Sequence, residues 1–284
     1  MRADGHAVRR RRFRCAIIGA VAAAVLAVGF LAYAADFYHA DPQAAALART
    51  DATIVTDGGL TILPGPTGST TGFIFYPGAK VEADAYLPIL EAIRQACGVT
   101  CVLVRMPFNM AIFDRDAADG AMARLPQVRR WYVGGHSMGG AMASAYAAGH
   151  HEKAQGLILM GAYLYGDYPG EHTLVIYGSL DAAIGDHLRG TEHVVCIPGG
   201  NHAQFGDYGP QRGDATAEIS RRQQQEAAVA AVAQFMKDDQ GAAGAASFLI
   251  RSMAHKKRRH GCIPCRLSVD VGVRLSMAAG AGAA

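Results

Sequence analysis

The octapeptide Val133-Gly134-Gly135-His136-Ser137-Met138-Gly139-Gly140 carries a single serine between glycines. A run rich in β-branched and aromatic residues precedes it and an alanine-rich run follows it, which predicts a sharp turn from a buried strand into a helix. Such a turn strains the serine backbone and holds the hydroxyl of Ser137 above the sheet edge, over the helix N-terminus. The adjacent positions need glycine because side chains there would collide with the neighbouring strand and helix. The pattern makes Ser137 a candidate nucleophile, with an ordinary strand-to-helix turn as the alternative.

Candidates for the two partners of a nucleophilic serine follow downstream. Serine needs a histidine base, and the imidazole needs a carboxylate that holds it in the correct tautomer. Asp181 comes after the apolar run 173–177, and His202 lies in the loop Gly199-Gly200-Asn201-His202-Ala203, after the run 194–197. Both residues therefore stand where a strand is expected to pass into a loop, as Ser137 does.

Other residues compete for both roles. Asp181 is preferred as the acid because it directly follows a strand-like segment after the serine's own helix and one further strand; its rivals are Asp167, Asp186 and Asp207. His136 adjoins the serine but is expected to point away from it. The other histidines considered have no glycine-rich loop to present them: His150, His151, His172, His187 and His193. His202 is therefore the preferred base.

Eight strand-like runs and five helical stretches fill residues 51–240. The strand-like runs are 53–55, 60–63, 71–76, 100–105, 130–133, 156–160, 173–177 and 193–197. The helical stretches are 82–96, 114–124, 138–150, 182–188 and 215–237. Strands alternate with helices from the third strand onward, which predicts an α/β fold with a mostly parallel eight-stranded sheet flanked by helices. Asp57-Gly58-Gly59 between the first two runs predicts a hairpin.

Four ordered segments carry a resemblance to a known family. They are 75–78, 104–109 (Val-Arg-Met-Pro-Phe-Asn), 134–140 and 199–206 (Gly-Gly-Asn-His-Ala-Gln-Phe-Gly). From about residue 51 to 236 the chain resembles single-domain α/β-hydrolases related to dienelactone hydrolases, in which the triad follows the chain order serine, acid, histidine. The resemblance implies a triad of Ser137, Asp181 and His202. It differs from dienelactone hydrolases proper, which carry cysteine where this chain has Ser137.

The same resemblance implies an oxyanion hole. In this fold a backbone N–H from the loop after the third strand joins the N–H of the residue that follows the nucleophile. The corresponding loop here is Pro77-Gly78-Ala79-Lys80, so Ala79 or Gly78 is expected to act with Met138. A simple Pro-Gly turn is the alternative.

The domain leaves no room for a large cap. The segment 162–169, after the sixth strand, is too short to form a lid. We therefore expect an open, shallow site. Its rim is expected to include Phe108, Asn109, Tyr163, Tyr165 and Phe205 as substrate-binding residues.

The N-terminus predicts a membrane segment. A basic n-region, 1–14, precedes the uncharged run 15–35, which is long enough to cross a bilayer. By the positive-inside rule the arginines stay in the cytoplasm and the rest of the chain is exported. We expect a single-pass anchor with the hydrolase domain outside the cytoplasm, although Ala32-Tyr33-Ala34 also fits a signal-peptidase site that would give a secreted protein. Residues 36–50 are expected to form a linker.

Charge is divided unevenly along the chain. Residues 1–14 hold six arginines and one aspartate, and residues 241–284 hold seven lysines and arginines against one aspartate. The remaining residues, 15–240, hold fourteen basic and twenty-two acidic side chains. The hydrolase domain is therefore acidic, which argues against nucleic acid as a partner.

The C-terminal segment 241–284 predicts a low-complexity basic tail without a fold of its own. Cys262 and Cys265, with His255 and His260, would make half a zinc site, but no second ligand pair exists, so no metal is expected. Cys97 and Cys101 are spaced for a short-loop disulfide in an exported domain.

The pattern as a whole predicts a serine hydrolase that acts on a small-molecule ester, thioester or lactone without a cofactor. Two alternatives stay open at this stage. One is a catalytically silent domain that serves as a surface binding module. The other is an acyltransferase that passes the acyl group to an envelope acceptor.

Overall fold

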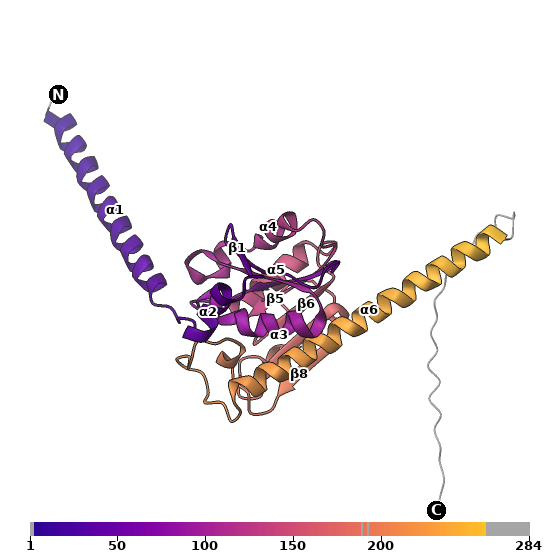
Figure 1. Ribbon diagram of the computed structural model, residues 1–284. Coiled ribbons are helices and arrows are strands. Elements are labelled where there is room, and N and C mark those ends of the chain that lie inside the picture. Colours follow the sequence, from indigo (N-terminus) through magenta and orange to yellow (C-terminus); the bar gives the residue numbers. More distant parts are fainter. Residues whose placement is uncertain (1–2, 189, 192, 260–284) are drawn as a thin grey trace, which may run out of the picture. The chain divides into compact units, whose positions relative to one another are not determined.

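The computed structural model describes residues 3–188, 190–191 and 193–259, and the chain divides into two compact units, residues 1–240 and 241–284. The first unit contains an eight-stranded sheet (Figure 1). Its strands are β1 (Val55–Asp57), β2 (Leu60–Leu63), β3 (Thr71–Tyr76), β4 (Thr100–Val104), β5 (Arg130–His136), β6 (Gly156–Met160), β7 (Thr173–Gly178) and β8 (His193–Ile197).

The strand order in the sheet is β1-β2-β4-β3-β5-β6-β7-β8. β1 pairs antiparallel with β2, and β2 pairs antiparallel with β4, whereas every pair from β4 to β8 is parallel. The predicted mostly parallel eight-stranded sheet is therefore confirmed. Because β4, β3 and β5 are neighbours and run parallel, the loops that follow them meet at one edge of the sheet.

The turn between β1 and β2 is the predicted hairpin. Asp57 faces Leu60 across it, so the loop has only two residues. Gly58 and Gly59 both have positive φ, +57° and +83°. Two consecutive positive φ angles are what a tight turn between twisted antiparallel strands requires, and glycine reaches them without strain.

Helices cover both faces of the sheet (Figure 1). The helices that flank the sheet are α3 (Leu87–Cys97), α4 (Ala117–Arg124), α5 (Met138–Gly149) and α6 (Arg221–Arg259), with 3-10 turns η1 (Ala83–Tyr86), η2 (Pro107–Asn109), η3 (Ala111–Phe113), η4 (Gly170–His172), η5 (Gly185–His187) and η6 (Ala203–Phe205). The expected helix 182–188 is not formed, since this stretch contains only the short turn η5.

Two apolar layers hold the helices to the sheet. On one face Phe73 and Phe75 of β3 pack with α3 and with the first half of α6. On the other face Ile74 and Tyr76, which alternate with them, pack with α4 and α5. Both faces of the central strands are buried, which explains their continuous apolar runs.

The N-terminal helix α1 (Ala3–Ala35) is apolar along most of its length. Its portion Phe13–Ala35, 23 residues, is long and apolar enough to cross a membrane. Large apolar side chains are exposed along it, Leu26 and Ile18 among them, so they do not belong to the protein core.

The segment expected to be a linker, 36–50, is ordered instead. Tyr38 forms a parallel bridge with Val81, and helix α2 (Pro42–Thr50) packs near α3 with Ala44 buried. A proline in the first turn of α2, where its missing N–H costs nothing, starts this helix.

The last helix is longer than predicted. It begins at Arg221 and continues to Arg259, whereas we expected it to end at 237 and the tail from 241 to lack a fold. The candidate zinc residues His260, Cys262 and Cys265 lie outside the described residues.

Candidate active site

Ser137 occupies the turn between β5 and α5 in a backbone conformation that non-glycine residues rarely adopt, with φ 54° and ψ −125°. Its N–H donates to the carbonyl oxygen of Met160, 3.0 Å away at the end of β6. This bond and the helix that starts at Met138 hold the strained turn. Gly139 approaches the carbonyl groups of Tyr76 and Pro77 so closely that a Cβ atom would overlap them, which explains the glycine there.

Asp181 and His202 are brought together from separate loops. Asp181 follows β7 and His202 follows β8, and the Oδ2 atom of Asp181 lies 2.6 Å from Nδ1 of His202. Both side chains are largely buried, with 6% of Asp181 and 17% of His202 exposed. A carboxylate only accepts, so Nδ1 carries the hydrogen and Nε2 is left as the proton acceptor.

The loop that carries His202 is held by a second aspartate. The backbone N–H groups of His202 and Ala203 donate to Oδ1 and Oδ2 of Asp214, at 3.2 and 2.7 Å. The two bonds anchor the backbone on either side of the imidazole. Asp214 lies in the loop before α6, and no local sequence pattern marks it as a partner of His202.

A buried glutamine holds the same loop from the other side. Gln224 of α6 accepts from the N–H of Asn201 at 3.0 Å and donates to its carbonyl oxygen at 2.8 Å. The amide group of Asn201 donates to the carbonyl oxygen of Ala215 at 2.8 Å. These bonds satisfy both backbone groups of the residue before His202, and they fix the position of the imidazole.

His136 links the two halves of the site. Its Nε2 lies 3.0 Å from the carbonyl oxygen of His202, which only accepts, so Nε2 carries the hydrogen. Its Nδ1 lies 2.8 Å from the hydroxyl of Tyr86, which donates to it, and the N–H of Gly78 donates to that hydroxyl at 3.1 Å. A continuous chain of hydrogen bonds therefore joins the loop after β3 to the loop after β8.

This chain of hydrogen bonds requires His136 to be neutral. Burial lowers the pKa of His136 well below its usual range, and the nearby His202 lowers it further. The rings of His136 and His202 lie 4.6 Å apart between centroids, and the Phe205 ring lies 5.7 Å from that of His136. Burial also raises the pKa of Tyr86, so its hydroxyl keeps the hydrogen that it donates.

The loop after β3 holds the two residues, Gly78 and Ala79, that were the alternatives for one of the oxyanion donors. The N–H of Gly78 is already bonded to Tyr86, so Gly78 does not fit the role expected of it. Among the described residues, neither the N–H of Ala79 nor that of Met138 has a protein acceptor. Lys80, with φ +57°, turns the chain sharply after Ala79, and its N–H donates to the carbonyl oxygen of Asn109 at 2.7 Å.

The residues expected at the rim differ in how exposed their side chains are. Phe108 and Asn109 have positive φ and lie in the loop after β4, where the side chain of Phe108 is half-exposed. Tyr163 is partly buried and stacks on His187 with centroids 4.5 Å apart. Phe205 is fully buried against His136, so it supports the site and offers no surface to a substrate.

The rival carboxylates that the structure describes lie elsewhere. Asp167 is exposed, and its backbone carbonyl accepts from His151. Asp207 pairs with Arg221 at 3.1 Å, and burial raises its pKa. Asp181 is therefore the carboxylate that the fold places against His202.

Comparison with known proteins assigns this part of the chain to a family. A model of the alpha/beta hydrolase family matches residues 72–226, which include Ser137, Asp181 and His202. The chain belongs to the alpha/beta hydrolase family. No curated protein sequence matches this hydrolase.

Several solved structures are similar to this alpha/beta hydrolase at low sequence identity. The ferulic acid complex of Est1E from Butyrivibrio proteoclasticus is 15% identical, covers 67% of this chain and 100% of its own, and has a TM-score of 0.45. A monoacylglycerol lipase from Paleococcus ferrophilus is 11% identical, with 63% and 100% covered and a TM-score of 0.47. A dienelactone hydrolase from Anabaena variabilis is 18% identical, with 66% and 94% covered and a TM-score of 0.41.

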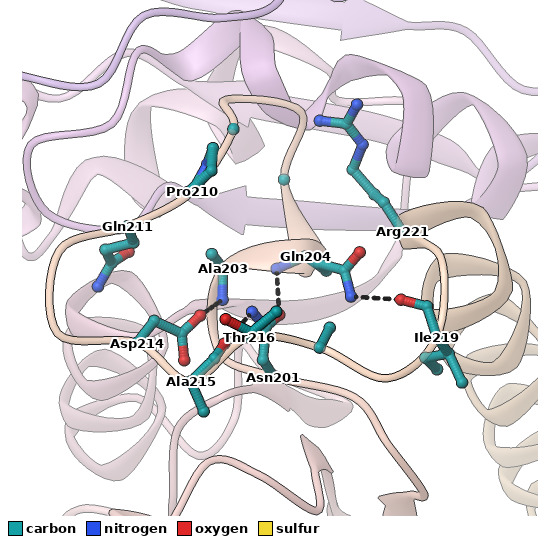
Figure 2. Close-up of a pocket in the computed structure, with 13 residues that line it drawn as sticks. Asn201, Ala203, Gln204, Pro210, Gln211, Asp214, Ala215, Thr216, Ile219 and Arg221 are labelled. Carbon is teal, nitrogen blue, oxygen red and sulfur yellow. Dashed lines mark hydrogen bonds between the residues drawn. The ribbon is translucent and has the colours of Figure 1, made fainter.

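A hollow of about 380 Å³ lies behind the His202 loop of this hydrolase (Figure 2). Asp214, Asn201 and Gln204 line it, and the carboxylate of Asp214 points to the backbone of Ala203. Ser137 is not among its lining residues. The side chains of Asn201, Gln204 and Asp214 are engaged in hydrogen bonds that hold the loop.

Within the described residues of this hydrolase, no group of three or more His, Cys, Asp or Glu side chains is placed to hold a metal ion. Cys97 and Cys101 are free thiols in the structure. Burial raises the pKa of Cys97 to about 11 and that of Cys101 well above its usual value, so neither thiol is a reactive nucleophile.

Proposed function

We propose that this alpha/beta hydrolase is a serine hydrolase that cleaves an ester, thioester or lactone through a covalent acyl-enzyme. One observation carries the proposal. Ser137 sits on the strained turn after β5, at the sheet edge where His202 and Asp181 meet at 2.6 Å. A serine turn and a carboxylate-oriented imidazole at one sheet edge are the elements of nucleophilic acyl transfer.

In the first step the Oγ atom of Ser137 attacks the substrate carbonyl carbon while Nε2 of His202 takes the hydroxyl proton. The carbonyl oxygen becomes an oxyanion, which the N–H groups of Met138 and Ala79 stabilise. The tetrahedral intermediate collapses, the bond to the leaving group breaks, and His202 returns the proton to the departing oxygen or sulfur. Asp181 stabilises the imidazolium throughout without itself taking the proton.

In the second step a water molecule takes the place of the leaving group. His202 removes a proton from the water as it attacks the acyl carbon, and the same proton then passes to Oγ of Ser137 as the ester bond to the enzyme breaks. The products are a carboxylic acid and the free serine. The open rim allows an alcohol to replace water in this step, which is the acyltransferase alternative.

We also propose that the domain is exported and stays attached through α1. The arginines before the apolar segment favour a cytoplasmic N-terminus. The junction supports retention, because Ala34 is buried, Tyr33 lies against Lys80, and Asp36 forms ion pairs with Lys80 and Arg212 at 3.2 and 3.0 Å. Cleavage after Ala34 would remove part of this packing.

Labelling of the full chain in detergent with a fluorophosphonate probe tests the proposal, with Ser137→Ala as the control. The parent is expected to be labelled and the variant is not, because only an activated serine reacts with such a probe. An unlabelled but folded parent would reject the proposal and favour the binding module. Product analysis of a fluorogenic ester with and without an added alcohol separates hydrolysis from acyl transfer.

A further inference from the structure

The junction between the membrane segment and the hydrolase domain is held in a fixed position by backbone hydrogen bonds. Three residues after the end of α1, the N–H of Tyr38 donates to the carbonyl oxygen of Lys80 at 2.7 Å, and the carbonyl oxygen of Tyr38 accepts from Glu82 at 2.8 Å. Three residues span at most about 10 Å. The outer end of α1 at Ala35 is therefore confined to the immediate neighbourhood of Lys80.

Lys80 belongs to the rim of the candidate active site. It directly follows Ala79, and its N–H bonds to Asn109 of the loop after β4. That loop continues into η3, which packs beside α5, the helix that begins after Ser137. The chain therefore enters the membrane beside the entrance to the site and not at the opposite end of the sheet.

The loop that continues from this rim is apolar. Phe108, Ile112 and Phe113 expose 48%, 58% and 49% of their surface. We call the loop 107–113 the apolar loop. Three large exposed apolar side chains within six residues form a surface that favours contact with lipid or another apolar partner.

The apolar loop lies level with the last turns of the membrane segment. The ring of Phe30 is 5.1 Å from that of Phe108 and 5.7 Å from that of Phe113, between centroids. Phe30 precedes Ala35 by five residues, which is about 7.5 Å along a helix. If α1 spans the bilayer, the rings of Phe108 and Phe113 lie at the depth where interfacial apolar side chains insert, about 5–10 Å below the membrane surface.

Polar groups mark the level of the lipid headgroups. Lys80 lies 4.0 Å from the centre of the Tyr33 ring and pairs with Asp36. Tyrosine and lysine are both favoured at membrane interfaces. On the far side of the apolar loop, Arg115 and Asp116 form an exposed pair at 3.2 Å, which ends the apolar surface.

We propose that the apolar loop docks on the outer leaflet of the membrane that holds α1, so that the active site opens onto the lipid surface. The substrate is then an ester whose apolar part lies in the bilayer and whose carbonyl lies at the headgroup level. This proposal deepens the proposed function and rests on it, and on α1 acting as the anchor.

A depth measurement tests the docking without any activity. The full chain is placed in phosphatidylcholine and phosphatidylglycerol vesicles, with Cys15, Cys196, Cys262 and Cys265 replaced by serine. A polarity-sensitive fluorophore is attached at Ile112→Cys, and at Glu152→Cys as the control. Glu152 is exposed in the turn before β6, at the opposite edge of the sheet. Spin-labelled lipids are expected to quench the fluorophore at position 112 and not at 152; equal, weak quenching at both positions would overturn the docking.

A kinetic measurement tests the substrate class. The double variant Ile112→Ser, Phe113→Ser is compared with the parent in the same vesicles, on a water-soluble fluorogenic ester and on a long-chain fluorogenic ester dissolved in the bilayer. Turnover of the soluble ester is expected to stay unchanged. Turnover of the bilayer ester is expected to fall by at least about tenfold, because the apolar contact with lipid is lost.

The outcomes separate this inference from the proposed function. Equal turnover of the bilayer ester by the parent and the double variant would overturn the lipid-borne substrate and leave the hydrolase intact. Absence of fluorophosphonate labelling would reject the proposed function, whereas the quenching comparison would still decide the docking.

Discussion

The imidazole Nε2 of His136 donates to the backbone carbonyl of His202, 3.0 Å away, so the residue before the candidate nucleophile holds the candidate base. The same ring accepts from Tyr86, whose hydroxyl also binds the N–H of Gly78. One buried histidine therefore sets the distance between the loop that carries His202 and the loop that carries Ala79. A change in this chain of hydrogen bonds is expected to act on catalysis as well as on stability.

Removal of the Tyr86 hydroxyl tests that coupling. Tyr86→Phe leaves the N–H of Gly78 and Nδ1 of His136 buried without their partner, which is expected to lower the free energy of unfolding by about 1–3 kcal/mol. Displacement of the Ala79 loop is expected to slow ester turnover by about ten- to a hundredfold. Tyr168→Phe is the matched control, because the buried Tyr168 hydroxyl donates to Ala154 at 3.0 Å, far from the site. Equal turnover in the two variants would argue against the coupling.

Stability is expected to depend on pH through His136. Burial lowers the pKa of His136 in the folded state, so below the usual histidine pKa of about 6.5 the unfolded chain binds a proton that the folded chain does not. The contribution of neutral His136 to the free energy of unfolding is complete above about pH 6.5. Below that pH, the free energy of unfolding falls by up to about 1.4 kcal/mol for each pH unit.

Urea unfolding of the full chain in detergent between pH 5 and 7.5 measures this slope. His136→Gln is expected to flatten it, whatever the variant's absolute stability. His39→Gln, at a side chain 74% exposed, is the control and should leave the slope as in the parent. A slope that persists in His136→Gln would assign the effect to another group.

The choice among the aspartates can be tested directly. Asp181→Asn keeps the size of the side chain but removes the charge that orients His202, and it favours the wrong imidazole tautomer. Ester turnover is expected to fall by about four orders of magnitude. Asp167→Asn, at an exposed rival position, is expected to leave turnover unchanged. A small effect of Asp181→Asn would remove Asp181 from the triad.

Asp214 is expected to position His202 without contact to a substrate. Asp214→Ala removes a charged acceptor from two backbone N–H groups, which is expected to lower the free energy of unfolding by about 1–3 kcal/mol. The value of kcat is expected to fall about tenfold, with a smaller change in KM. Asp214→Asn keeps one acceptor, so its free energy of unfolding and its kcat should lie between those of the parent and those of Asp214→Ala. Asp238→Ala on the exposed side of α6 serves as the control, and a loss of stability with unchanged kcat would make the role of Asp214 purely structural.

The sequence alone identified what local patterns encode. Glycines on both sides of Ser137 predicted a sharp, strained strand-to-helix turn, and the backbone there is strained, with a positive φ. Alternation of strands and helices predicted the parallel sheet, because each strand and each amphipathic helix carries its period in its own residues. Asp181 and His202 were selected because each ends a strand, and parallel strands bring such ends to one edge, where the two side chains lie 2.6 Å apart.

Only the tertiary structure decided which side chains support the sheet edge that carries the candidate site. It also decided which side chains that edge exposes. His136 meets Tyr86 across 50 residues and His202 across 66, and no local pattern records such pairs. The same long-range packing engages the N–H of Gly78, buries Phe205 and joins Tyr38 to Lys80 beside the apolar loop. Periodicity encodes what a segment does to its own backbone, whereas the partners of a buried polar group depend on how distant segments pack, which the complete fold alone determines.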